Sequence, residues 1–428
     1  MAYQETTTTG YGKRVGNSFR GILPGLLLFL AGTALLWWNE GRAVKTDKML
    51  KEAENVTVEM ENIDRVDPQF DGKLVYATGM TATADSLIDS EFGIGAKAVK
   101  MKRDVEYYQW VEHQSSESRD KLGGKQETVT TYTYERRWVS SPVESARFRD
   151  PAYQRKNFVL KTVEENSQRA QTVTFGAYTL NDSQVNSIWG DVPVDLQIDE
   201  KLLKNWDKEV GKAYERYNPK TITKHAAKVV EVPDTAAKDT LPPDAPNKYD
   251  LDYVHVNGNV VYYGQTPGSP EVGDVRVTFT KVMPGQVTII AKTNGNTFTS
   301  FKAKNGKTFS TLQMGKRELS EIYEGEHQGN TIFLWILRIV GVMMVIGGLR
   351  GIFGIIEMLL KVVPFLANIV GWGVNLVCSV VGIVWSLLVI AIAWLFYRPL
   401  IGVALLVVAG AITWFFVKRA KAKKTGTI

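Results

Sequence analysis

Residues 21–38 have the sequence GILPGLLLFLAGTALLWW, eighteen residues without a charged side chain. About 20 apolar residues cross the core of a bilayer, and roughly 17 suffice. The run ends in Trp37 and Trp38, a residue type that anchors helices in the headgroup layer. A cleavable signal peptide would end in small residues instead. The stretch therefore predicts an uncleaved first transmembrane helix.

Three further apolar runs lie in the C-terminal quarter of the chain. They predict transmembrane helices at residues 331–349, 374–397 and 400–417, with the last two forming a tight hairpin. Residues 350–373 contain three charges and Pro364 among apolar side chains. Because charges and proline fit poorly in hydrocarbon, the composition favours an interfacial or re-entrant amphipathic segment here over a fifth span.

Lysine and arginine near the span ends predict the orientation. The N-terminal tail (1–20) and the C-terminal tail (418–428) are both basic, so both are expected in the cytoplasm, which requires an even number of spans. The insert, residues 39–330, then lies on the other side. It has 39 basic and 43 acidic residues, whereas the whole chain has 51 and 45 and a net charge of +6. The positive excess thus belongs to the membrane and tail portions and argues against a nucleic-acid partner.

The insert has the pattern of a mainly antiparallel β domain. Alternating apolar and polar residues at Ala98–His113 and Glu127–Val139, linked through Gly123-Gly124, predict a long protruding β-hairpin. Three Asn-Gly pairs predict type I′ turns in a meander from Tyr253 to Met314. These pairs are Asn257-Gly258, Asn294-Gly295 and Asn305-Gly306.

Helices are expected at four places in the insert. The first span continues as a helix to Lys51, a short helix follows Asn181 or Asp182, another covers Leu202–Tyr217, and a charged helix from Lys316 to Glu326 leads into the second span.

The sequence shows no reaction centre. His113, His225, His255 and His327 are not at metal-ligand spacing. The neighbouring carboxylates Asp85, Asp89 and Glu91 fall in an expected loop, where a solvated acidic surface is favoured over a calcium or catalytic site. The single cysteine, Cys378, lies in the third span. We therefore expect no catalytic, cofactor-binding or metal site and no enzymatic activity.

Arg338 is the most unusual residue of the apolar runs. An arginine near the centre of a span costs about 2.5–3.5 kcal/mol on insertion scales. The functional interpretation pairs it with Glu357, the nearest acid in sequence, or places it on a polar path with Asn368 and Asn375. The alternative is that its side chain reaches the interface from a span that starts elsewhere.

Four collinear blocks resemble a known family over almost the whole chain. They are Asn39-Glu40-Gly41-Arg42 after the first span, Tyr108-Gln109-Trp110, Gly273-Asp274-Val275-Arg276, and Tyr397-Arg398-Pro399. In these blocks the chain resembles the transmembrane protein 43 family, also called LUMA. Residues 149–247 look unlike the animal members, and the compact tails suggest a bacterial homologue.

The resemblance implies four spans, cytoplasmic tails and a large domain in the lumen or its bacterial equivalent. Animal members are proteins of the endoplasmic reticulum and inner nuclear membrane, thought to organise membrane protein complexes with lamins and emerin among their partners. The resemblance supplies no catalytic residue.

The expected fold is a multi-pass α-helical membrane protein with four transmembrane helices and a large α+β domain, mainly antiparallel β, between the first and second. The expected function is a membrane scaffold, and its expected partners are membrane lipids, other membrane or envelope proteins, or further copies of itself. The alternative is an oligomeric channel or small-solute transporter that uses Arg338 and the C-terminal helices.

Overall fold

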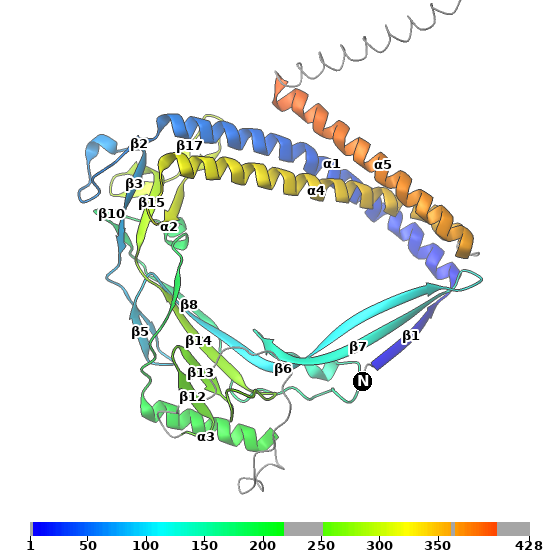
Figure 1. The fold of residues 1–428 in the computed structure, drawn as a ribbon, viewed down its shortest axis with the longest axis horizontal. Coiled ribbons are helices and arrows are strands. Elements are labelled where there is room, and N and C mark those ends of the chain that lie inside the picture. Colours follow the sequence, from blue (N-terminus) through cyan, green and yellow to red (C-terminus); the bar gives the residue numbers. More distant parts are fainter. Residues whose placement is uncertain (1–2, 218–250, 361–363, 400–428) are drawn as a thin grey trace, which may run out of the picture.

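Three long helices form one side of the molecule. The computed structural model describes residues 3–217, 251–360 and 364–399. The long helices are α1 (Tyr11–Val56), α4 (Leu319–Leu360) and α5 (Pro364–Tyr397). Figure 1 shows them together, with the strands and the shorter helices α2 (Asp182–Asn186) and α3 (Glu200–Tyr217) making up the remainder.

Helices α1 and α4 run antiparallel in close contact. At 1.5 Å per residue, the 46 residues of α1 span about 69 Å, so the helix continues well beyond its apolar run, as predicted. Glycines allow the close approach: a Cβ atom on Gly25 would lie 2.9 Å from the carbonyl oxygen of Gly348. A Cβ atom on Gly348 would lie 2.5 Å from the backbone nitrogen of Phe29. Larger side chains at this crossing would separate the two helices.

Within the described ranges, α1, α4 and α5 are the helices long and apolar enough to cross a membrane. The described part of the chain therefore has three candidate spans, and the fourth predicted span (400–417) and the basic tail (418–428) lie outside it.

Residues 350–373 do not form the separate segment that the sequence suggested. Residues 350–360 continue α4 without a break, and residues 364–373 begin α5. Pro364 occupies the first position of α5, where a missing backbone N–H costs nothing, so it starts a helix instead of interrupting one.

The larger of two main sheets carries the predicted hairpin. Its strands, in order across the sheet, are β1 (Tyr3–Thr9), β7 (Gln126–Val139), β6 (Lys100–Asp120), β14 (Val275–Val282), β13 (Val260–Tyr263) and β12 (Val254–Asn257), with β8 (Asn166–Arg169) beside β6 and β11 (Asp191–Pro193) beside β14. Leu203, Trp206 and Val210 of α3 pack on this sheet in a core that includes Phe279.

The second sheet adjoins the long helices. Its strands, in order, are β19 (Thr311–Met314), β15 (Gln286–Asn294), β16 (Thr297–Thr299), β10 (Tyr178–Thr179), β9 (Thr174–Phe175), β3 (Leu74–Ala82) and β2 (Val58–Glu59). Because β15 also pairs with β3, five of these strands close into a ring around buried side chains such as Phe175, Ile289 and Phe298.

Short elements complete the description. They are the two-stranded sheets β4 (Ser86–Asp89) with β5 (Ile94–Lys97) and β17 (Phe301–Lys302) with β18 (Thr308–Phe309), and single 3₁₀ turns at Pro68–Phe70 and Ser145–Arg147. Beside them, Leu50 of α1 and Ile322 and Tyr323 of α4 pack on Leu74 and Ile290 of the second sheet. This packing joins the long helices firmly to the β-rich region.

The predicted meander is confirmed only in part. Strands β12, β13 and β14 pair in sequence in the first sheet, whereas β15, β16 and β19 belong to the second sheet, and the predicted turn type is wrong. The loops after β12 and β15 have Gly258-Asn259 and Gly295-Asn296 as their two central residues. Only the glycines have positive φ, 57° and 58°. A type I′ turn needs positive φ at both central residues, whereas one at the first position is typical of type II′. The Asn-Gly signal therefore located the hairpins one residue away from their true centres.

The N-terminal strand joins the long hairpin to the beginning of α1. Strand β1 pairs with β7 through seven consecutive residues, from Tyr3 opposite Tyr132 to Thr9 opposite Gln126. At the hairpin tip, Arg14 forms an ion pair with Asp120 at 2.7 Å and donates to the Gly124 carbonyl oxygen at 2.8 Å. The described elements thus trace a closed outline from α1 through both sheets and back along the hairpin (Figure 1).

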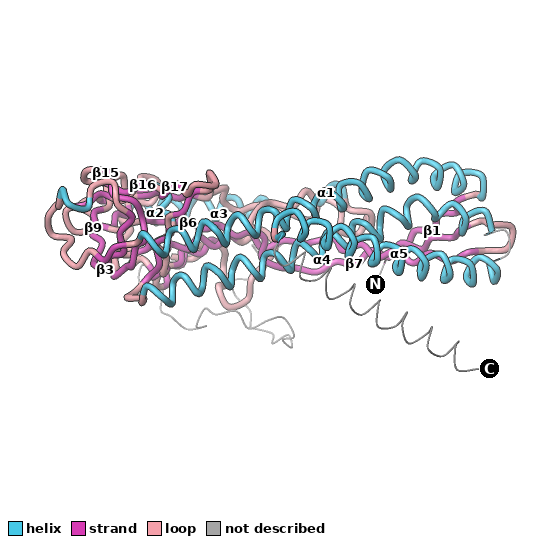
Figure 2. Tube along the Cα trace, turned by 90° about the horizontal axis from the view of Figure 1, so that it is seen from above, coloured by secondary structure: helices cyan, strands magenta, loops and turns pink. Residues whose placement is uncertain are grey.

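This pairing bears on the expected separation of residues 1–20 from the insert, which stays a prediction. One sheet does not lie on both sides of a bilayer, so in this structure the tail and the hairpin share a side. The charge pattern counts lysine and arginine alone and takes no account of strand pairing. Four consecutive threonines have high β propensity, and the edge of β7 offers backbone groups for them to pair with. Figure 1 and Figure 2 show the hairpin tip meeting the N-terminal end of α1 at one end of the elongated molecule, while the rest of the hairpin lies apart from the long helices.

Candidate functional site

The first motif block follows the apolar run of α1 and points into the helix interface. Glu40 is fully buried and binds Arg338 of α4 through two contacts, Nε to Oε1 at 2.6 Å and Nη2 to Oε2 at 3.0 Å. Trp394 of α5 donates its indole N–H to Glu40 Oε2 at 2.9 Å. One carboxylate therefore connects all three long helices, in a group that we call the membrane node (Asn39, Glu40, Arg338 and Trp394).

Aromatic rings cover the arginine. The Arg338 guanidinium lies 4.7 Å from the ring centre of Trp335 and 5.6 Å from that of Trp394. Contacts of this kind favour a cation more strongly when water is excluded, and Arg338 is only 9% exposed. The positive charge is thus neutralised and shielded inside the helix bundle.

Neighbouring residues of the same block extend the contacts toward the β-rich region. Asn39 Nδ2 donates to the Leu334 carbonyl oxygen at 2.9 Å. Arg42 donates to Asn330 Oδ1 at 3.0 Å, and its guanidinium lies 4.6 Å from the ring centre of Phe333. These bonds fix the rotation of α1 relative to α4.

The last motif block meets the first. A Cβ atom on Gly41 would lie 2.6 Å from Tyr397 Cζ, so glycine is required where the tyrosine ring crosses α1. The backbone N–H of Arg398 donates to the Trp394 carbonyl oxygen, and Pro399 follows at the end of the described chain. Two blocks more than 350 residues apart in sequence thus form one contact surface.

The expected partner of Arg338 was wrong. Sequence proximity favoured Glu357, but the carboxylate that binds Arg338 belongs to Glu40, 298 residues away. In the sequence, Glu40 belongs to a motif block, and no local pattern connects it with Arg338. The antiparallel packing of α1 on α4 brings the two together.

The two middle blocks also meet, at the base of the hairpin. The N–H of Tyr108 donates to the carbonyl oxygen of Asp274 at 2.9 Å, and the N–H of Gly273 donates to that of Tyr108 at 3.0 Å. The Trp138 ring lies between Tyr108 and Arg276. Its centre is 5.2 Å from the centre of the Tyr108 ring and 4.4 Å from the guanidinium carbon of Arg276. This arrangement fixes the direction in which the hairpin leaves the sheet.

Asp274 is a buried carboxyl group in this cluster. It is 1% exposed, and its Oδ2 accepts hydrogen bonds from the Tyr262 hydroxyl and the Glu271 N–H. Burial raises the pKa of Asp274 to about 7, although these two hydrogen bonds act to lower it. Burial also raises the pKa of Tyr262 far above its ordinary value. Gly264 packs directly against this carboxyl group, because a Cβ atom there would lie 2.3 Å from Asp274 Oδ1.

Gln109 and Trp110 hold the chain that follows the hairpin. Gln109 donates to the Phe158 carbonyl oxygen at 3.0 Å and accepts from the Val143 N–H at 2.6 Å. The Trp110 backbone exchanges two hydrogen bonds of 2.9 Å with the Asn157 side chain. These contacts serve structure, since they occupy the polar atoms that would otherwise be available to a ligand.

The loop carboxylates differ from expectation. Asp89 is 2% exposed and pairs with the buried Arg103 at 3.0 Å, and Glu91 pairs with the same arginine at 2.7 Å. Asp85 accepts hydrogen bonds from the backbone of Gln171 and Thr172. The three residues are therefore structural and do not form a solvated acidic surface.

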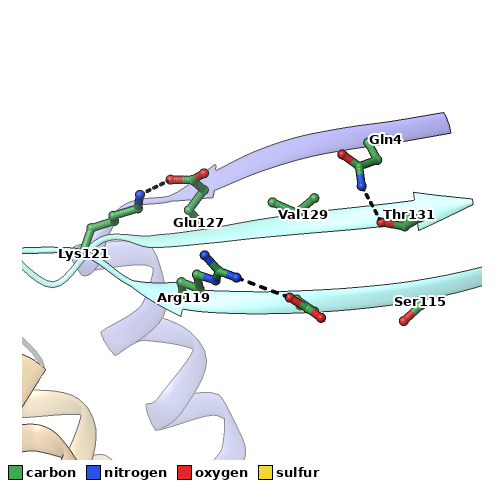
Figure 3. A pocket seen from close by; sticks show the side chains of 8 residues that line it. Gln4, Ser115, Arg119, Lys121, Glu127, Val129 and Thr131 are labelled. Atoms are coloured by element: carbon green, nitrogen blue, oxygen red, sulfur yellow. Dashed lines mark hydrogen bonds and ion pairs between the residues drawn. The ribbon is translucent and has the colours of Figure 1, made fainter. Parts of the chain in front are cut away.

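The remaining polar features of the described residues offer no metal site. No group of three or more His, Cys, Asp or Glu side chains there is placed to hold a metal ion. A shallow pocket of about 310 Å³ on the hairpin is lined by charges that pair among themselves, such as Lys121 with Glu127 at 2.7 Å (Figure 3). His255 is a residue of strand β12, as predicted, and His225 lies outside the described ranges.

Comparison with known proteins decides the family. A sequence model described as "Transmembrane protein 43" matches residues 107–399, more than half of the chain. The chain belongs to the transmembrane protein 43 family. It is 28% identical to Transmembrane protein 43 of Rattus norvegicus and of Homo sapiens, over 91% of this chain and 88% of each relative. The Transmembrane protein 43 homolog of Drosophila melanogaster is 26% identical over 91% of this chain and 93% of that protein.

No solved structure matches the chain. In this member of the transmembrane protein 43 family, the four motif blocks form two contact clusters. One lies between the long helices and the other at the base of the hairpin.

Proposed function

We propose that this protein is a non-enzymatic membrane scaffold that organises membrane protein complexes through its β-rich region. The observation that carries the proposal is the connection of the long helices to one another and to the β-rich region at three separate places. These are the membrane node, the packing of Leu50 and Ile322 on the second sheet, and the bonds of Arg14 to the hairpin tip. A frame held at three places keeps a binding surface at a fixed position relative to the bilayer.

The proposed partners are membrane lipids, other membrane or envelope proteins, and further copies of the chain. The helices present large apolar side chains such as Leu27, Trp335 and Leu387 at their exposed faces, as lipid contact requires. The β-rich region exposes Trp189 to 69%, and tryptophan is enriched at protein interfaces.

The proposed location is a bacterial inner membrane with the β-rich region on the periplasmic side, or the endoplasmic reticulum and nuclear envelope in a eukaryotic cell. The acidic balance of the insert supports its export, and the pairing of β1 with β7 takes residues 3–9 to the same side.

Cross-linking in intact membranes tests the scaffold. A photoreactive residue at Trp189 should capture neighbouring proteins, and the same residue at Ser116, on the polar hairpin, is the matched control. The captured neighbours should then disperse into smaller complexes on native gels when the chain is deleted. Unchanged migration of every captured neighbour would contradict the proposal.

The alternative function is an oligomeric channel or small-solute transporter built around Arg338. The observation in its favour is a buried charge within a candidate span. Pairing with Glu40 and shielding by two indoles support a structural use of the charge instead. Solute flux into liposomes that disappears in Arg338→Leu would favour the channel, and flux equal to that of empty liposomes would remove it.

A further inference from the structure

The tip of the long hairpin combines an exposed apolar side chain with two lysines. Residues 121–125 have the sequence KLGGK. Leu122 is 83% exposed, the highest value among the large apolar side chains of the described residues. Lys121 and Lys125 on either side are exposed as well. A single exposed apolar side chain is normal on a protein surface, so Leu122 alone indicates no partner. Its place between two lysines gives the tip an apolar group flanked by cations, the composition of a loop that meets a membrane surface.

The tip is held at the level where α1 begins its apolar run. Arg14, only 4% exposed, binds both Asp120 and the Gly124 carbonyl oxygen. Tyr11 packs against Gly124, where a Cβ would lie 2.3 Å from the ring, and its hydroxyl donates to the Leu359 carbonyl oxygen at 3.0 Å. The tip is therefore fixed to the ends of α1 and α4 together.

The distance to the membrane core is short. The apolar run starts at Gly21, seven residues after Arg14, which corresponds to about 10 Å along the helix. The headgroup layer occupies about 5–7 Å on each side of the hydrocarbon core. A tip fixed beside Arg14 therefore lies about 3–5 Å beyond the headgroup layer when α1 stands upright, and closer to the headgroups when α1 tilts or lies along the membrane.

The charge around the tip is suited to anionic lipid. Asp120 is occupied by Arg14. Glu127 is paired with Lys121, but this pair is exposed and weak, so a lipid phosphate can replace the carboxylate as the partner of Lys121. Lys13 and Arg20 are exposed on the adjoining turns of α1. Exposed cations therefore outnumber exposed acids at this end, which favours an anionic surface over a second copy of the same basic tip.

We propose that residues 121–125 form a membrane-anchoring loop, which inserts Leu122 into the interfacial layer and binds anionic phospholipid headgroups through Lys121 and Lys125. The protein then contacts one leaflet at two separate places, through this loop and through the apolar faces of the long helices. This anchoring is independent of whether the protein acts as a scaffold.

A fluorescent probe tests the loop directly. The only cysteine is Cys378, so Cys378→Ala gives a background in which Leu122→Cys carries a single environment-sensitive dye. The labelled protein is placed in lipid nanodiscs with and without anionic phospholipid. We expect a blue shift and a gain in emission with anionic lipid, and quenching by lipids that carry a nitroxide near the headgroup.

Matched variants separate lipid contact from other causes. A dye at Ser116→Cys, six residues back and about 20 Å along the strand, should show neither the shift nor the quenching. Replacing Lys121 and Lys125 by glutamine should weaken the anionic-lipid response, by about fivefold for each lysine at low salt. A blue-shifted dye at position 122 that lipid nitroxides leave unquenched would mean contact with protein and would overturn the proposal. An unshifted dye would overturn it equally.

Discussion

The carboxylate of Glu40 is the group on which the packing of the three long helices centres. Both of its oxygens are used, by Arg338 and Trp394. A buried ion pair adds little stability compared with an apolar pair, but removal of one partner leaves a charge without compensation in a dry environment. The node is therefore sensitive to single substitutions.

Arg338→Met should destabilise the protein by about 3–5 kcal/mol, because it leaves the Glu40 carboxylate unpaired. The measurement is thermal unfolding of the purified protein in detergent micelles. The double variant Glu40→Gln/Arg338→Met should recover part of the loss. Arg317→Met is the matched control: its pair with Glu321 is exposed at both ends, and such pairs contribute about 0–1 kcal/mol. Equal melting of Arg338→Met and wild type would show that the node contributes nothing to stability.

Asp274 makes stability depend on pH. Its folded pKa of about 7 lies above the ordinary value of 3.8, so the folded state binds the proton more tightly than the unfolded state. The associated stability is fully present below about pH 4 and is lost as the pH rises from 4 to 7. We expect Asp274→Asn to flatten this part of the profile of melting temperature against pH, since asparagine keeps an acceptor for Tyr262 and has no charge to bury. A profile with the same slope in the variant would show that another group titrates there.

At the scale of elements, the contact between α1 and α4 depends on glycine. Gly348→Leu should separate the helices, because even its Cβ would collide with the backbone of Phe29. We expect a lower melting temperature and weaker packing of α1 and α4 against α5. Gly354→Leu is the control, because a Cβ atom at that position of the same helix would meet no neighbouring atom within 4 Å. If both variants melt alike, the crossing is looser than the structure shows.

Elements with local signals were predictable. The capping box of Asn181 and Gln184 starts α2 where the sequence indicated, and alternation located β6 and β7. Signals that rest on distant partners were not. Two examples are the pair of Glu40 with Arg338 and the burial of Asp89 by Arg103. Both depend on packing between distant segments, and no spacing in the sequence indicates that packing. Pro364 was misread because proline disfavours a helix interior yet favours a first turn.

At the scale of the whole molecule, strand β1 bears on the expected topology. The charge rule treats residues 1–20 as a cytoplasmic tail, whereas Tyr3–Thr9 of this stretch pair with β7 of the hairpin. The strands near the tip are polar on both faces, as Ser116 and Thr130 on one face and Arg119 and Glu127 on the other illustrate. Open polar strands do not lie in hydrocarbon, so this whole sheet belongs to the water on one side of the membrane.

The two attachments of α1 bear on how the long helices lie in the bilayer. Arg14 joins one end of α1 to the hairpin tip, and Leu50 joins the other end to the second sheet. A helix that crosses a bilayer has its ends on opposite sides. While both attachments hold, the apolar faces of α1 and α4 therefore lie along one leaflet, and a crossing helix requires that β1 and the tip separate from each other.

A disulfide distinguishes these two arrangements in the membrane itself. Thr6 and Val129 are direct partners across β1 and β7, and antiparallel partners have Cα atoms about 4.5–5.5 Å apart, within reach of a disulfide. In the Cys378→Ala background, Thr6→Cys/Val129→Cys should therefore cross-link under mild oxidation of intact membranes, with peptide mass spectrometry as the readout. The control variant is Thr6→Cys/His113→Cys, which should not cross-link. His113 is on the next strand, β6, about 13 Å along that strand from the position opposite Val129. If the first pair forms no disulfide, in protein that melts like wild type, then β1 is not paired with β7 in the membrane. Residues 3–9 would then lie on the opposite side of the bilayer from the hairpin.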